Sequence, residues 1–218
     1  LYGDAGDDCI EGNAGDDFAD GGSGKDEIAG GFGVDSLHGG SGNDTLFGQE
    51  DGDTLAGDTG DDVLYGNDAD DTLDGGPGDD ELYGGRGEDI LVGGDDDDLL
   101  YGGDGNDVAD GEAGNDEVHG NGGEDEVAGG PDDDLVFGEE SDDTVYGGTG
   151  DDILLGDGGG FYREGAVGDD AGVVIRVWTQ PMILDGDDVI DGGSGNDIIF
   201  GGTGAESITD SDGSDVVF

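Results

Sequence analysis

Residues 39–47 read Gly39-Gly40-Ser41-Gly42-Asn43-Asp44-Thr45-Leu46-Phe47, and this nonapeptide is one copy of a pattern that fills most of the chain. As a consensus the unit is G-(G/N/D)-x-G-x-D-x-U-x, in which U is aliphatic. Aspartate holds the sixth place seventeen times in succession, from Asp8 to Asp152, and glycine holds the first place from Gly3 to Gly147. A fixed period of this kind is the signature of a solenoid, a fold built from stacked repeats.

The x-U-x end of each unit predicts a strand of three residues whose middle side chain points inward. The six preceding residues are expected to form a turn, because glycine at the first, second and fourth places supplies the left-handed backbone that tight turns need. Two strands on opposite sheets would then meet through a single layer of aliphatic side chains. The sequence therefore predicts an all-β fold, a right-handed parallel β-roll in which eighteen residues complete one coil.

In such a roll the turns stack in two columns, one along each edge. One column contains Asp8, Asp26 and Asp44, and the other contains Asp17 and Asp35, each continuing with the same spacing. Neighbouring turns would lie about 4.8 Å apart, so a calcium ion between them could take oxygen ligands from both at about 2.3–2.6 Å. Hard oxygen ligands without a cluster of cysteine or histidine favour Ca²⁺ over zinc or copper.

The charge of the chain supports a structural cation. The sequence has 61 acidic and 4 basic residues, for a net charge of -57. Carboxylates one strand apart repel by roughly 1 kcal/mol per pair even in water, so we expect a chain that is disordered alone and folds with multivalent cations. The acidity argues against nucleic acid and anionic membranes as direct partners, and no apolar run long enough to cross a membrane is present.

The nonapeptide closely resembles the repeats-in-toxin (RTX) calcium-binding β-roll, over about 190 residues. The resemblance implies that the repeated aspartate and turn carbonyl oxygens of one coil form half of a calcium site, which the turn eighteen residues on completes. It also implies type I secretion from a Gram-negative bacterium and folding outside the cell. The implied metal ligands are Asp8, Asp17, Asp26, Asp35, Asp44, Asp53, Asp62, Asp71, Asp80, Asp89, Asp98, Asp107, Asp116, Asp125, Asp134, Asp143, Asp152, Asp188, Asp197 and Asp215.

The pattern departs from the family at several places. Glu206 replaces the aspartate of one late repeat, which puts that site in doubt. Five of the first seventeen repeats lack glycine at the fourth place, where we expect strain in the turn; they have Asp51, Ala69, Asp96, Asp132 and Ser141 instead.

Residues 158–184 interrupt the repeats, so the chain divides into a roll over 1–157, an interruption over 158–184 and a continuation of the roll over 185–218. The interruption is three times nine residues long. As degenerate repeats it would place Arg163, Gly172 and Pro181 in the core, which suits neither a core nor a strand. The favoured interpretation is an excursion shaped like a β-hairpin, after which Asp188 joins the column of Asp143. This excursion could dock a partner or pack locally against the roll.

The outward ninth place is largely aromatic in alternate repeats, from Phe47 to Phe137, which indicates either a ladder of stacked rings or a contact surface. The single cysteine, Cys9, also points outward and is expected to be a free thiol, with an intermolecular bridge as the alternative. His38 and His119 have no neighbouring nucleophile in the pattern, so we expect no enzyme activity.

These observations lead to a structural function. We expect a calcium-binding β-roll of a secreted, extracellular or cell-surface bacterial protein that serves as a stalk or filament segment. The alternative is a calcium-dependent secretion and folding appendage of an enzyme, toxin or adhesin. Both ends stop in repeat-like sequence, so we also expect end-to-end or lateral self-association.

Overall fold

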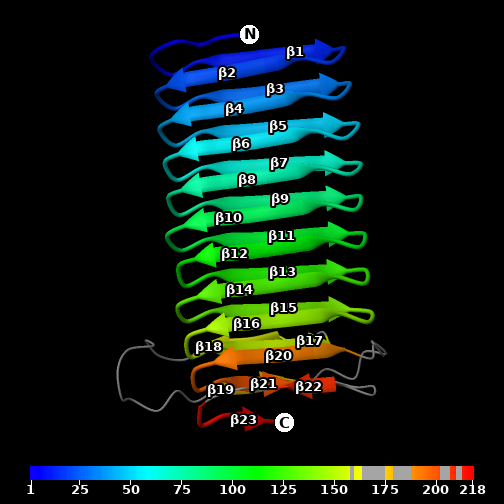
Figure 1. The fold of residues 1–218 in the computed structure, drawn as a ribbon. Helices are drawn as coiled ribbons and strands as arrows, with labels where there is room; N and C mark the ends of the chain where they lie inside the picture. The colour runs from blue at the N-terminus through cyan, green and yellow to red at the C-terminus, as the bar shows by residue number, and fades with distance from the viewer. Residues whose placement is uncertain (158–159, 164–174, 179–187, 202–206, 210–212) are drawn as a thin grey trace.

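The computed structural model describes residues 1–157, 160–163, 175–178, 188–201, 207–209 and 213–218. Within these residues every regular element is a β-strand. Figure 1 shows the strands stacked one above another, with the N-terminus at one end of the stack and the C-terminus at the other. The strands form two long parallel sheets, and the fold is therefore the β-solenoid that the nine-residue period predicts.

Odd-numbered strands build an eleven-stranded sheet, and even-numbered strands build a ten-stranded sheet. The first sheet consists of β1 (Cys9–Ala14), β3 (Glu27–Phe32), β5 (Thr45–Glu50), β7 (Val63–Asp68), β9 (Glu81–Arg86), β11 (Leu99–Asp104), β13 (Glu117–Gly122), β15 (Leu135–Glu140), β17 (Ile153–Asp157), β21 (Ile198–Phe200) and β23 (Val216–Val217). The second consists of β2 (Phe18–Ser23), β4 (Ser36–Ser41), β6 (Thr54–Thr59), β8 (Thr72–Pro77), β10 (Ile90–Asp95), β12 (Val108–Ala113), β14 (Glu126–Pro131), β16 (Thr144–Thr149), β20 (Val189–Ser194) and β22 (Ser207–Thr209).

The register between neighbouring strands is eighteen residues through the regular part of the roll. Leu82 in β9, for example, pairs with Leu64 on one side and Leu100 on the other. Each side chain therefore has its equivalent in the next coil as its neighbour, and identical positions form continuous rows along the roll.

The predicted strand length is wrong. Strands β2 to β16 are six residues long, not three, because pairing continues through the first three places of the following unit. In β5 the ladder includes Gln49 and Glu50, which pair with Asn67 and Asp68 of β7. The buried first-place glycine allows this extension, since it lets the chains stay in close contact beyond the aliphatic place. The true turns are the three residues that end with the aspartate.

The core is a single row of aliphatic side chains from each sheet, as the pattern predicts. Each of these residues is at most 1 % exposed, and most are fully buried. The core residues are Ala19, Ile28, Leu37, Leu46, Leu55, Leu64, Leu73, Leu82, Leu91, Leu100, Ala109, Val118, Val127, Val136, Val145, Leu154, Ile190 and Ile199.

The roll continues in register beyond the interruption. Strand β16 pairs with β20, and Val145 lies beside Ile190. Inside the interruption, β18 (Gly160–Arg163) and β19 (Ile175–Trp178) form a separate antiparallel pair. This register is the one that the excursion interpretation requires. Asp170, Glu206 and the ends of the 158–184 segment lie outside the described residues, so its exact boundaries stay a prediction.

Candidate calcium sites

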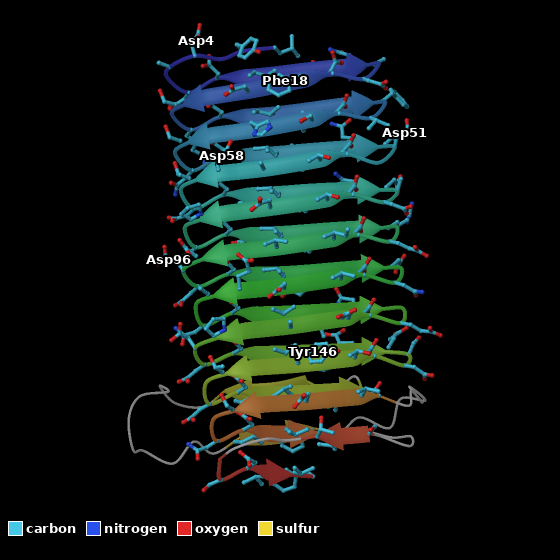
Figure 2. All side chains as sticks on the ribbon, viewed as in Figure 1. Asp4, Phe18, Asp51, Asp58, Asp96 and Tyr146 are labelled. Atoms are coloured by element: carbon cyan, nitrogen blue, oxygen red, sulfur yellow. The ribbon has the colours of Figure 1, made fainter. Side chains whose placement is uncertain are left out.

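The repeated aspartates lie along both edges of the roll, each directly before a strand. Asp80, for example, ends a turn and is followed by β9. The strand that follows fixes its backbone, so the side chain points into the turn rather than toward solvent. Figure 2 shows oxygen atoms gathered along both edges of the stack. Of the twenty predicted ligands, Asp8, Asp17 and Asp215 are half-buried near the ends of the roll, and the other seventeen are buried.

From Asp26 onward, one oxygen of each described column carboxylate already has a partner. Oδ1 of Asp80 accepts a 2.6 Å hydrogen bond from the backbone N–H of Asp62, in the preceding coil. The N–H of Asp80 in turn donates to Oδ1 of Asp98 at 2.8 Å. The same bond links Asp143 to Asp188 across the interruption, at 2.9 Å. Every aspartate is thus held by its neighbours, and both columns form continuous hydrogen-bonded rows.

The second oxygen is the unusual feature. At most of these positions Oδ2 is buried and has no hydrogen-bond partner among the described residues. Buried carboxylate oxygens without a partner are costly and call for an explanation, of which a bound ion is one. The aspartates with such an Oδ2 are Asp8, Asp26, Asp35, Asp44, Asp53, Asp62, Asp71, Asp80, Asp89, Asp98, Asp107, Asp116, Asp125, Asp134 and Asp152.

The first-place glycine keeps a space open beside this oxygen. A methyl group placed on Gly75 would lie 2.5 Å from Oδ2 of Asp80 and 2.7 Å from the carbonyl oxygen of Gly93 in the next coil. Those two oxygens therefore face one small space that only glycine leaves free. The arrangement recurs along both columns, for example at Gly102, with Oδ2 of Asp107 at 2.5 Å and the carbonyl oxygen of Gly120 at 2.7 Å.

Burial makes the charged form of many of these carboxyls, those in the middle of the roll above all, unfavourable in the bare protein. It raises the pKa of Asp62, Asp71 and Asp80 to about 7, and that of Asp98 and Asp134 to about 8. The hydrogen bond from the preceding coil lowers each pKa, and neighbouring carboxylates raise it again. Stacking the coils without a counterion therefore requires protons on groups that are ionised in the unfolded chain.

The oxygen set fits a hard divalent cation. It combines an anionic carboxylate oxygen with a backbone carbonyl oxygen, both of which calcium accepts. Within the described ranges, no three side chains of the His, Cys, Asp and Glu types converge into a metal cluster. A cation at these sites would thus be held by few side chains together with backbone carbonyl oxygens of the neighbouring coil.

Backbone geometry explains the pattern of turn residues. All five exceptions at the fourth place have positive φ, between 73° at Asp51 and 89° at Ala69 and Ser141. Strain is therefore present where the sequence predicts it, since this region is unfavourable for residues with a Cβ. Asp51 and Asp96 are labelled at opposite edges of the roll in Figure 2.

Two polar features were not anticipated. Fifth-place side chains form an outer row in which Oδ1 of Asp97, for example, accepts from the backbone N–H of Asn115 at 2.9 Å. The sequence feature that could have predicted this outer row is the frequent Asp or Asn directly before each buried aspartate. His119 also has carboxylate partners on both ring nitrogens, Glu117 at 3.0 Å and Glu139 at 2.9 Å. These contacts raise its pKa against the opposing effect of burial.

Two parallel sheets joined by turns that are lined with aspartate place the protein in the class of parallel β-solenoids. The chain belongs to the RTX calcium-binding nonapeptide repeat family, whose sequence profile matches residues 1–160 and 184–218 in overlapping copies. No curated protein matches the sequence. The chain is therefore a calcium-binding β-roll, a structural repeat domain typical of secreted bacterial proteins. The described residues include no helix with the length and apolarity to span a membrane.

Proposed function

We propose that the protein is a calcium-gated structural element: disordered where calcium is scarce, and folded into a rigid roll outside the bacterial cell. In this role it forms a length of stalk or filament in a secreted or cell-surface protein. The proposed ligands are the twenty aspartates of the two columns, together with the carbonyl oxygens of the first-place glycines.

The observation on which this proposal rests is the row of buried Oδ2 atoms along each edge. Most of these atoms lie near a carbonyl oxygen of the next coil, across a space that glycine keeps open, as at Asp80, Gly75 and Gly93. About one ion per stacked pair of turns would supply close to twenty ions, which would offset about two thirds of the net charge of -57. Folding and ion binding would then be one event.

The first test is calcium-dependent folding, measured by circular dichroism. In EGTA we expect a disordered chain, because the unneutralised carboxylates repel one another, and millimolar calcium should restore the sheet signal. A stable sheet in EGTA at neutral pH would contradict the proposal.

A pair of variants localises the effect. Asp80→Asn keeps the size of the side chain but removes the charge from the column, so the calcium midpoint should rise and the loaded roll should lose about 2 kcal/mol. Asp79→Asn makes the same change at the exposed neighbouring residue, and its calcium midpoint should stay close to that of the wild type. Equal effects of the two substitutions would show that only net charge matters.

A further inference from the structure

A row of stacked rings runs along the outer face of the odd-numbered sheet. Neighbouring rings have centroids 4.4–5.3 Å apart and planes within 17° of parallel. The ring faces are therefore covered by one another, which leaves their edges and polar groups for solvent. The members of this ring ladder are Phe47, Tyr65, Tyr83, Tyr101, His119 and Phe137.

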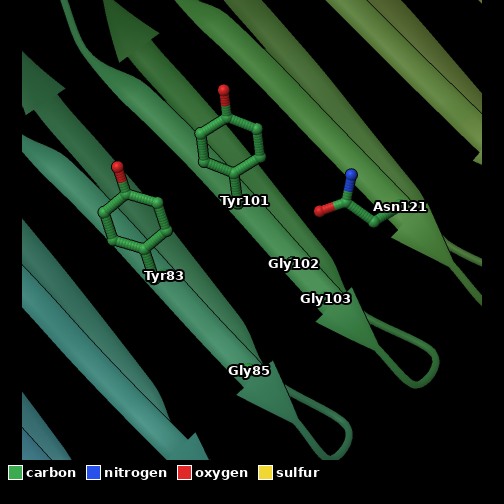
Figure 3. A pocket seen from close by; sticks show the side chains of 6 residues that line it. All are labelled: Tyr83, Gly85, Tyr101, Gly102, Gly103 and Asn121. Carbon is green, nitrogen blue, oxygen red and sulfur yellow. The ribbon is translucent and has the colours of Figure 1, made fainter.

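Three consecutive rings of the ladder are tyrosines. The centroids of Tyr65 and Tyr83 are 4.9 Å apart, and those of Tyr83 and Tyr101 are 5.3 Å apart. Figure 3 shows the rings of Tyr83 and Tyr101 side by side on neighbouring strands, with their hydroxyl groups pointing the same way. The two rings line a shallow groove together with Asn121 and three glycines, Gly85, Gly102 and Gly103. All three tyrosines are half-buried, so a small oxidant can reach them.

A proton acceptor is also in place. The hydroxyl group of Tyr83 donates a 3.1 Å hydrogen bond to Oε2 of Glu81 on the same strand. Burial, and next this hydrogen bond, raise the pKa of Tyr83 to about 12. The phenol therefore stays protonated at neutral pH, so its oxidation releases a proton, which Glu81 is placed to accept.

We propose that Tyr65, Tyr83 and Tyr101 form an oxidative cross-linking site, at which a peroxidase using hydrogen peroxide joins neighbouring coils through dityrosine bonds. Each of two rings loses one electron and its phenolic proton. The two radicals then couple through the carbons beside their hydroxyl groups, and the hydrogens on those carbons move to the oxygens to restore both phenols. The peroxide takes up the two electrons and two protons and is reduced to water.

The register makes this site selective. Tyr65, Tyr83 and Tyr101 are neighbours across β7, β9 and β11. Tyr146 lies on the opposite sheet, where its neighbours in register are Ala128 and Asp191. A link in the ladder would tie coils eighteen residues apart. It would restrict the calcium-free chain as a disulfide does, so the linked roll should need less calcium to refold.

The test uses the few cleavage sites of the chain. Trypsin separates residues 26–86, which contain Tyr65 and Tyr83, from residues 87–163, which contain Tyr101. Dilute protein in calcium is treated with peroxidase and hydrogen peroxide, and the monomer is digested in EGTA for mass spectrometry. We expect dityrosine fluorescence, a product that joins 26–86 to 87–163, and a 26–86 peptide lacking two hydrogen atoms.

Matched variants assign the links. Tyr83→Phe keeps the stacked ring but should abolish both products, Tyr65→Phe should abolish only the internal one, and Tyr146→Phe should change neither. Circular dichroism in calcium verifies that each variant is folded. Joined peptides that persist in Tyr83→Phe, or links found only between chains, would overturn the proposal. Fewer links are expected when the oxidation is carried out in EGTA, and this expectation rests on the proposed calcium-gated folding. The comparison among variants in calcium tests the cross-linking site independently of that proposal.

Discussion

At the scale of the residue, glycine and aspartate act as a pair. The first-place glycine contributes the absence of a side chain, and the aspartate contributes the oxygen that faces the resulting space. At Gly75 this space is bordered by Oδ2 of Asp80 and the carbonyl oxygen of Gly93. The period of the glycine is therefore as much a feature of the proposed calcium site as the period of the carboxylate.

Gly75→Ala tests this pairing. The new methyl group would overlap both oxygens, so the calcium-loaded roll should lose at least about 2 kcal/mol of unfolding free energy. Gly122→Ala is the control, because a methyl group there would meet only the carbonyl oxygen of Gly103, at 3.5 Å. Denaturant unfolding in calcium measures both. An alanine tolerated equally well at the two positions would remove the proposed role of the space.

At the scale of the element, the turn has only three residues, and its shape is set by its fourth-place backbone. Where glycine is missing, the substitute keeps the left-handed conformation, as Ala69 does with a φ of 89°. The strands on both sides impose this conformation, because their register leaves the turn no other path. The cost of the imperfect repeats is thus local strain rather than a change of fold.

Restoring glycine should recover that cost. Ala69→Gly should stabilise the roll by about 1 kcal/mol, since glycine adopts positive φ without the clash of a Cβ. Ala56→Gly, in the extended strand β6, should instead destabilise it by about 0.5–1 kcal/mol. Thermal unfolding in saturating calcium compares the two. A loss of stability at both positions would show that unfolded-chain entropy outweighs turn strain.

At the scale of the whole molecule, the buried carboxyls link folding to pH. Burial raises the pKa of many of them in the folded protein, to about 8 at Asp98 and Asp134. The calcium-free roll therefore binds more protons than the unfolded chain, and its stability falls as the pH rises toward these values. Calcium binding requires ionised carboxylates, because protonated carboxyls are poor ligands.

Acid should partly replace calcium. In EDTA the sheet signal should be stronger at about pH 5 than at about pH 8, and calcium affinity should change in the reverse direction. Circular dichroism in EDTA and calcium titration at each pH measure the two trends. The lower pH lies above the sequence pI of about 4.1, which limits precipitation. A calcium-free chain whose sheet content grows with pH would contradict the pKa shifts.

The second whole-molecule prediction is lateral self-association in calcium. Ile90 and Val108 are neighbours on the outer face of the even-numbered sheet and are 47 % and 43 % exposed. Neutralising the edges would allow such faces to meet. Light scattering should show association that depends on calcium. The double variant Ile90→Ser with Val108→Ser should weaken this association, whereas Val63→Ser on the other sheet should leave it unchanged. A wild type that stays monomeric at high concentration in calcium would refute it.

The nine-residue unit, the eighteen-residue coil, the single-layer core and the two aspartate columns could all be predicted from the sequence. These features follow from the nine-residue period, because the side chain at a given place of the repeat points inward or outward in the same way in every unit. Leu46, Leu64 and Leu82 could be assigned to the core without knowing their neighbours, and so could the strained turn at Ala69.

The features that depend on contact between coils could be seen only in the folded molecule. These are the six-residue strands, the buried Oδ2 atom that lacks a hydrogen-bond partner at most of the described column aspartates, and the glycine space beside it. The register of Asp188 beside Asp143, 45 positions earlier, also belongs here. They could not be established from the sequence alone, because each contact joins atoms from different coils. A local pattern names the atoms, but only the stacking of coils determines which of them meet.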